Sequence, residues 1–128
     1  TNYDEEQKKK KKILLVEDNK INQMITKKML ENKGIVCIIK DNGEDTVKLM
    51  HNHKYDLVLM DVHLPGINGT EATKQIREFD NTVPIIALTA ISLDENRETL
   101  LSYGMNDVIT KPFIPEEFYT IISKYIAN

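Results

Sequence analysis

The chain has 128 residues, 41% of them hydrophobic and 29% charged, which is enough for one domain with a core of its own. Its formal net charge of −3 gives no reason to expect direct contact with nucleic acid. No apolar run approaches the roughly 20 residues that cross a bilayer, so we expect no membrane contact by this domain. The single cysteine, Cys37, excludes an internal disulfide and favours a reducing, cytoplasmic location.

The N-terminal segment is polar and highly charged. It is acidic at first and then carries five consecutive lysines, Lys8 to Lys12, directly before the first apolar run. A charge run of this kind is usually solvated, so we expect residues 1–12 to be a tail or linker and residues 13–128 to be the folded domain. The alternative is a basic patch for an acidic partner.

Short apolar runs then alternate with longer amphipathic segments. The runs are residues 13–16, 35–39, 57–60, 85–88 and 108–109. Their apolar residues are continuous, which is typical of strands covered on both faces of a parallel sheet. The order predicts an α/β fold with five βα units, a doubly wound three-layer sandwich with right-handed crossovers.

The segments between the runs carry apolar residues at helical spacing. The clearest case is the last segment, with Phe118, Ile121, Ile122, Tyr125 and Ile126. Shorter stripes comprise Ile21, Ile25 and Met29; Val47, Met50 and His51; and Ala72, Ile76 and Phe79. The segment 93–101 is the most polar, so we expect it to be the least tightly held helix.

Sequence signals also mark where some helices begin. Ser92 with Glu95 has the pattern of a capping box, and Asn68 with Glu71 is close to one. Pro115 suits the first turn of the last helix.

Charged and hydroxyl side chains stand where the strands should end. Glu17 and Asp18 follow the first run, Asp61 follows the third, Thr89 the fourth and Lys111 the fifth. Parallel α/β sheets gather ligand groups at the carboxyl ends of their strands, so these side chains should converge. An acidic pair after a strand can also be a simple helix N-terminal charge, but matching groups at three other strand ends favour a site.

Carboxylates brought together in this way repel one another unless a cation joins them. Mg²⁺ takes oxygen ligands and usually keeps some waters. We expect Asp18 and Asp61 to ligate it directly, Glu17 directly or through a water, and the backbone carbonyl of His63 to add a further oxygen. His51, His53 and His63 do not form a metal-binding set.

The same groups suit phosphoryl transfer onto an aspartate. The reaction requires in-line positioning and neutralisation of charge on the phosphoryl oxygens. We expect Asp61 to be the nucleophile, with Lys111 and the Thr89 hydroxyl each contacting a phosphoryl oxygen. Lys111 precedes Pro112, and the sequence leaves open whether a cis bond aims the lysine into the site or the lysine is exposed before a trans proline.

Four stretches together resemble the receiver domain of two-component response regulators: "ILLVEDNKIN", "YDLVLMDVHLPGINGTEATKQIR", "VPIIALTA" and "GMNDVITKPF". The resemblance implies a flavodoxin-like fold with strand order 2-1-3-4-5. It also implies that Glu17 and Asp18 are the Mg²⁺-binding pair and Asp61 the phosphoacceptor. Thr89 matches the switch hydroxyl and Lys111 the lysine that pairs with the phosphate.

By the same resemblance, the phosphoryl donor is a histidine on a kinase or on a histidine phosphotransfer domain. The motifs resemble those of receivers fused to hybrid sensor histidine kinases, and the chain ends just after the last helix. We therefore expect either a single-domain regulator or, preferably, the C-terminal receiver of a hybrid kinase, tethered through residues 1–12 and passing its phosphoryl group onward. We expect a monomer or a weak homodimer.

Two departures from the family pattern bear on mechanism. Val108 stands where many members carry the aromatic residue of the switch. His63 and Ile91 stand two positions after Asp61 and Thr89, where the family lines the path of the hydrolytic water. The resemblance does not give the sign of their net effect on phosphoryl lifetime.

The sequence is also compatible with two other functions. One is a degenerate receiver that binds partners without phosphorylation, which the missing aromatic favours and the complete set of acids, hydroxyl and lysine opposes. Another is a Mg²⁺-dependent hydrolase with an aspartyl nucleophile. Such enzymes usually carry a second aspartate where this chain has His63. In either receiver reading, Ile21, Ile25 and their neighbours are a predicted docking face for a kinase helix.

Overall fold

The computed structural model describes residues 10–90 and 96–126. Within them, five parallel strands form one sheet in the order β2-β1-β3-β4-β5. The strands are β1 (Lys12–Val16), β2 (Val36–Lys40), β3 (Leu57–Asp61), β4 (Ile85–Ala90) and β5 (Asp107–Lys111). The strand order expected from the sequence is confirmed.

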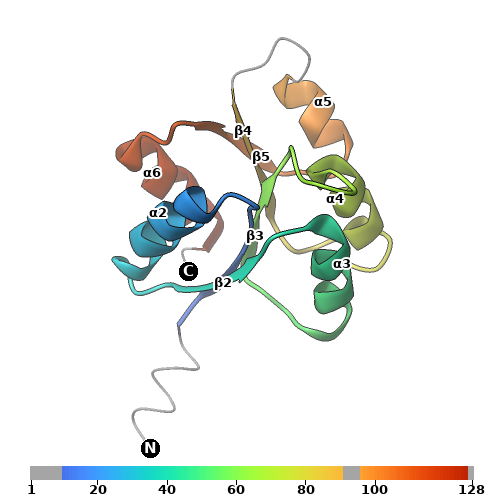
Figure 1. Ribbon diagram of the computed structural model, residues 1–128, viewed down its shortest axis with the longest axis horizontal. Helices are drawn as coiled ribbons and strands as arrows, with labels where there is room; N and C mark the ends of the chain where they lie inside the picture. The colour runs from blue at the N-terminus through green and yellow to red at the C-terminus, as the bar shows by residue number, and fades with distance from the viewer. Residues whose placement is uncertain (1–9, 91–95, 127–128) are drawn as a thin grey trace, which may run out of the picture.

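Helices cover both faces of the sheet, as the doubly wound prediction requires. They are α2 (Lys20–Glu31), α3 (Gly43–Asn52), α4 (Gly69–Arg77), α5 (Arg97–Ser102) and α6 (Pro115–Ile126). Figure 1 shows α2 and α6 on one face and α3, α4 and α5 on the other. Among the residues described, no helix is long and apolar enough to cross a membrane.

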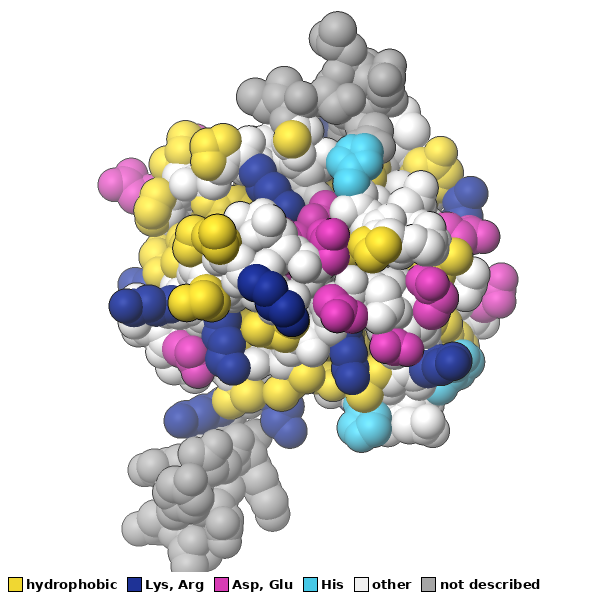
Figure 2. Space-filling view, in the orientation of Figure 1, with side chains coloured by type: hydrophobic (Ala, Val, Ile, Leu, Met, Phe, Trp, Pro, Cys, Tyr) yellow, Lys and Arg dark blue, Asp and Glu magenta, His cyan; other side chains and the backbone are white. Residues whose placement is uncertain are grey.

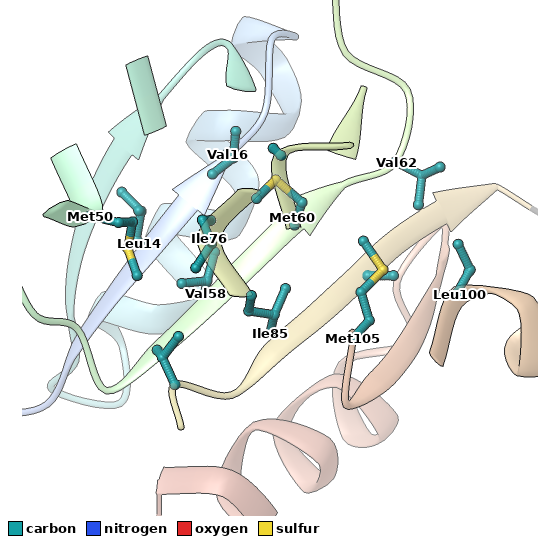
Figure 3. Close-up of a cluster of buried hydrophobic side chains, with 13 residues drawn as sticks. Leu14, Val16, Met50, Val58, Met60, Val62, Ile76, Ile85, Leu100 and Met105 are labelled. Carbon is teal, nitrogen blue, oxygen red and sulfur yellow. The ribbon is translucent and has the colours of Figure 1, made fainter. Parts of the chain in front are cut away.

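Two hydrophobic clusters hold the layers together, because alternate residues of each strand point to opposite faces of the sheet. In β1, Leu14 and Val16 join the cluster beneath α3, α4 and α5. Ile13 and Leu15 join the cluster beneath α2 and α6. Figure 3 shows the first cluster, in which side chains of the inner strands meet Met50, Ile76 and Leu100 from the three helices. Each fully buried side chain of this size contributes roughly 1.5–3 kcal/mol to folding.

Asparagines cap four of these helices. Asn19, Asn42, Asn68 and Asn96 each accept a hydrogen bond from the backbone N–H three residues later. The cap predicted at Asn68 is therefore confirmed. The capping box predicted at Ser92 and Glu95 lies outside the described residues, and the described part of that segment becomes helical only at Arg97, after Asn96.

The strands extend further than their apolar runs. The β4–β5 ladder continues through the pairs Thr89–Thr110 and Ala90–Lys111. Thr89 and Lys111 therefore lie within the last residues of strands, and Asp61 ends β3, whereas the sequence placed all three just after them. The difference arises because ladder hydrogen bonds do not depend on whether a side chain is apolar.

The first helix buries a different face from its most regular apolar stripe. Gln23, Thr26 and Leu30 are buried, whereas Ile21 and Ile25 are 67% and 52% exposed. Burial of Gln23 is tolerated because its side-chain amide donates a hydrogen bond to the Glu17 carbonyl at 2.6 Å. The stripe at Ile21 and Ile25 indicated a helix correctly but lies on its outer surface.

Candidate active site

The strand register brings the predicted site residues to one edge of the sheet. Val16 pairs with Met60, so Glu17 follows β1 beside Asp61 at the end of β3. Asp61 in turn pairs with Leu88, which precedes Thr89. These pairings place residues far apart in sequence at neighbouring strand ends, as expected for an open parallel sheet.

Three carboxyl groups gather at this edge. One oxygen each of Glu17, Asp18 and Asp61 lies within 4.8 Å of the others. Glu17 and Asp61 are buried, at 1% and 6% exposure, and Asp18 is exposed. Oxygen donors on a partly open cluster fit Mg²⁺, which binds a few carboxylates and retains waters in its remaining positions.

Lys111 lies between two of these carboxylates. Its Nζ is 2.9 Å from Asp61 Oδ2 and 3.1 Å from Glu17 Oε1. The Lys111–Pro112 peptide bond is cis, which settles the alternative that the sequence left open. The lysine is turned into the site and is not a freely exposed side chain.

The pKa values of the site are shifted because acidic side chains lie close together where they are largely buried. Burial, and then the neighbouring Asp61 carboxyl, raise the pKa of Glu17 to about 7. Burial opposes the charged form of Lys111, but Asp61 and Glu17 outweigh it, so the pKa of Lys111 is raised. The site thus favours cations among its carboxylates.

The remaining predicted groups lie around Asp61. The backbone N–H of His63 donates to Asp61 Oδ1 at 3.0 Å, and the His63 side chain is exposed. Thr89 is 4% exposed, and its hydroxyl donates to the Ala90 carbonyl at 3.0 Å. The role of the His63 carbonyl as a metal ligand stays a prediction, and Ile91 lies outside the described residues.

Two residues that shape the site had not been anticipated. Gln23 holds the backbone at Glu17, as described above. Gly69, the first residue of α4, packs so closely that a β-carbon there would lie 2.1 Å from the Asp61 carbonyl oxygen. The Asn-Gly pair at Asn68 was a signal for Gly69, whereas nothing in the sequence distinguished Gln23 from an exposed helical glutamine.

An apolar surface adjoins the acidic cluster. Ile21, Met24, Ile25 and Ile114 are all more than half exposed. Beside them a groove of about 300 Å³ runs from Glu17 and Lys111 past Ile25 to Phe113. Figure 2 shows hydrophobic side chains gathered over α2 and α6, next to acidic ones at the centre of the view.

Val108, which stands where many family members carry an aromatic residue, packs against the core. Val108 is partly buried against the cluster beneath α3, α4 and α5. Phe113 stacks on Phe118, with ring centroids 5.0 Å apart, and the Tyr103 ring lies under the Lys74 ammonium. Both aromatics therefore have packing partners of their own.

A comparison with family models matches residues 13–123 to the response regulator receiver domain. The chain belongs to this family. Receiver domains are the phosphoacceptor modules of two-component signalling, so the resemblance drawn from the four sequence stretches is confirmed.

Among curated proteins, the receiver is 35% identical over 115 residues to transcription factor SKN7 of Saccharomyces cerevisiae, covering 90% of this chain and 18% of that protein. It is 36% identical over 146 positions to probable histidine kinase 1 of Oryza sativa subsp. indica, covering 88% of this chain and 15% of that protein. The chain thus spans less than a fifth of either relative, and one is a transcription factor and the other a kinase.

Solved receiver domains have the same fold. The receiver of sensor histidine kinase PA1611 from Pseudomonas aeruginosa, with magnesium coordinated in its active site cleft, matches with a TM-score of 0.85 and 40% identity over 93% of this chain and 99% of that one. The receiver of Ssk1 from Saccharomyces cerevisiae, crystallised with the phosphotransfer protein Ypd1, matches with a TM-score of 0.84 and 32% identity over 91% and 89%.

Proposed function

We propose that Asp61 of this receiver accepts a phosphoryl group from a phosphohistidine in a Mg²⁺-dependent reaction. The observation that carries the proposal is the placement of Asp61 between an acidic pair and Lys111 Nζ, 2.9 Å away. Glu17, Asp18, Asp61 and the His63 carbonyl would hold Mg²⁺, which when bound would neutralise charge on the phosphoryl oxygens. The magnesium-containing relative supports this choice of ion.

The chain's own residues then have distinct tasks in the transfer. A carboxylate oxygen of Asp61 forms a bond to phosphorus while the phosphorus–nitrogen bond to histidine breaks, and the electron pair of that bond returns to the imidazole. Lys111 remains beside Asp61 and contacts one phosphoryl oxygen, and the Thr89 hydroxyl turns from the Ala90 carbonyl to contact another. The product is an aspartyl phosphate.

The partner in this proposal is a histidine kinase or a phosphotransfer protein. Phosphotransfer requires the donor histidine to come close to Asp61, and the exposed apolar residues of α2 border that approach. The relative crystallised with a phosphotransfer protein supports this class of partner. We propose that Ile21, Met24 and Ile25 form the contact surface.

We also propose the kind of protein in which this receiver occurs. We favour a receiver within a hybrid histidine kinase, with residues 1–12 as linker, because several relatives are histidine kinases. Such a receiver acts in the cytoplasm and passes its phosphoryl group onward.

The transfer is tested with a radiolabelled phosphohistidine protein as donor. Label should move to this chain only with Mg²⁺ present, and hydroxylamine should release it, because an acyl phosphate is labile to that nucleophile. Asp61→Asn should receive no label, and Ile21→Ala with Ile25→Ala should slow transfer from the protein donor but not from acetyl phosphate. Label on Asp61→Asn would overturn the assignment of the phosphoacceptor.

A further inference from the structure

The connection between β3 and α4 leads directly away from Asp61. At its base it is closed by a hydrogen bond from the Gly69 N–H to the Val62 carbonyl at 2.9 Å. Leu64 and Ile67 pack against the cluster beneath α3, α4 and α5. The His63 carbonyl, the predicted fourth metal ligand, lies within this connection, so its position depends on what holds the outer part of the loop.

The first turn of α3 holds that outer part. Glu44 Oε1 accepts a hydrogen bond from the Ile67 N–H at 3.2 Å. The same carboxylate covers Gly66, which has φ +72°, and a β-carbon at Gly66 would lie 2.4 Å from Glu44 Oε2. The Glu44 side chain therefore packs against the loop backbone at two consecutive residues, Gly66 and Ile67.

The backbone of α3 also packs closely against the β3–α4 connection, at Gly43. A β-carbon at Gly43 would lie 2.8 Å from Ile67 Cγ1 and 3.1 Å from the Ile67 carbonyl oxygen. Helices α3 and α4 lie side by side on one face of the sheet, so the loop that enters α4 passes over the start of α3 (Figure 1).

Glu44 is held ready for this role by the cap of its own helix. Asn42 accepts from the Asp45 N–H at 2.7 Å, and its side-chain amide donates to Asp45 Oδ2 at 3.0 Å. These bonds fix the first turn of α3 and leave the Glu44 carboxylate directed at the loop. Asp45 carries an equal charge in the same turn but bonds to the cap instead.

We propose that Glu44 is a positioning residue, which holds the β3–α4 connection in the conformation that binds the metal through the His63 carbonyl. The inference rests on the proposed Mg²⁺ chemistry and adds to it a residue outside the acidic cluster. Only molecules whose β3–α4 connection is in that conformation bind the metal well. The apparent metal affinity therefore falls in proportion to the fraction of molecules that keep this conformation. Because the hydrogen bond is exposed and the base of the loop has other contacts, we expect a loss of about three- to tenfold.

The test is an NMR titration of the whole chain with MgCl₂, using wild type, Glu44→Ala, Glu44→Gln and the matched control Asp45→Asn, which removes a charge from the same turn but keeps an acceptor oxygen for the Asn42 amide. Glu44→Ala should weaken Mg²⁺ binding three- to tenfold and speed hydrogen exchange at the Ile67 amide. Glu44→Gln keeps an acceptor oxygen without the charge and should restore most of the affinity. Asp45→Asn should bind as wild type does.

Each contrary outcome has a separate meaning. Equal affinity of wild type and Glu44→Ala would overturn the inference while leaving the proposed function intact. Equal weakening by Glu44→Gln and Asp45→Asn would show a general charge effect and would also overturn it. If wild type itself binds no Mg²⁺, the proposed function fails, and the inference fails with it. Thermal unfolding of each variant separates loss of the fold from loss of loop position.

Discussion

Lys111 contacts two of the three acidic side chains of the site, and this position gives it two opposing effects. Its ammonium pairs with Asp61 and Glu17 in the metal-free site. During transfer it would contact the phosphoryl group, but before transfer its charge disfavours a second cation nearby. Under the proposed function, Lys111 would thus assist the phosphoryl transfer and weaken Mg²⁺ binding.

Lys111→Ala separates these effects. Phosphorylation by acetyl phosphate at saturating Mg²⁺ should slow by about 10²-fold, the usual cost of removing one preorganised group that stabilises transition-state charge. Mg²⁺ affinity should rise, because a positive charge about 3 Å from two carboxylates has been removed. Initial rates from mass spectrometry and an NMR titration measure the two quantities. Lys20→Ala, an exposed lysine at the start of α2, is the control.

An unchanged phosphorylation rate in Lys111→Ala would contradict the role given to this lysine. Weaker Mg²⁺ binding would contradict the electrostatic account, since it would require the ammonium to support the ion rather than to compete with it.

For individual residues, the sequence predicted which side chains meet at the strand ends but missed the residues that hold them in place. Asp61 and Lys111 were predictable because their chemical types are unusual beside apolar runs. Gln23 and Glu44 look like ordinary residues of solvent-facing helices in the sequence. Their roles depend on distances between segments far apart in the chain, such as the 3.2 Å from Glu44 to Ile67.

Among the elements, α4 depends on a single side chain for its start. Asn68 Oδ1 accepts from the Glu71 N–H at 3.0 Å and from the Thr70 hydroxyl at 2.7 Å. An N-cap of this kind stabilises a protein by about 1 kcal/mol. Because the helix begins where the loop from Asp61 ends, the cap also fixes Gly69 against the site.

Asn68→Ala should therefore lower the free energy of unfolding by about 1 kcal/mol. The measurement is urea unfolding followed by circular dichroism, with Asn81→Ala in the exposed α4–β4 connection as control. A loss in the control as large as in Asn68→Ala would show that the effect is not specific to the cap.

A second link between elements joins α5 and α6 to β5. The buried Asp107 carboxylate accepts hydrogen bonds from Arg97, from the Tyr125 hydroxyl at 3.0 Å and from the Val108 N–H at 2.9 Å. Burial opposes ionisation of Asp107, but these bonds outweigh it, so the pKa of Asp107 lies below its ordinary value of 3.8. The charged carboxylate thus ties three elements together.

Asp107→Asn should destabilise the protein by about 2 kcal/mol at pH 7, since hydrogen bonds to a charged group are lost. A lowered folded pKa means that the stabilisation is complete above pH 3.8 and is lost as the pH falls through the folded value. The difference in unfolding free energy between the two proteins should therefore shrink below pH 3.8. A difference that stays constant down to pH 2 would contradict the assignment.

Helix faces were harder to predict than helix positions. The stripe of Ile21 and Ile25 indicated α2 but not its orientation, because a buried Gln23 with a satisfied amide can replace an apolar residue facing the sheet. For α6, whose apolar residues are more numerous, the predicted face and the buried Phe118 and Ile122 agree.

For the whole molecule, the sequence determined the fold because five continuous apolar runs admit few arrangements other than a covered parallel sheet. The sheet order then places the strand ends of β1, β3, β4 and β5 side by side, and the site follows from topology. The parent protein does not follow in the same way. Relatives of both transcription-factor and histidine-kinase type contain this module, so the fold is shared while the output differs.

The role of Asp61 is tested by intact-mass spectrometry of the chain after incubation with acetyl phosphate, with and without Mg²⁺, on wild type and Asp61→Asn. We predict a single phosphoryl adduct that requires Mg²⁺ and is absent from Asp61→Asn. An adduct that persists in Asp61→Asn, or that forms equally without Mg²⁺, would show that Asp61 is not the metal-dependent phosphoacceptor.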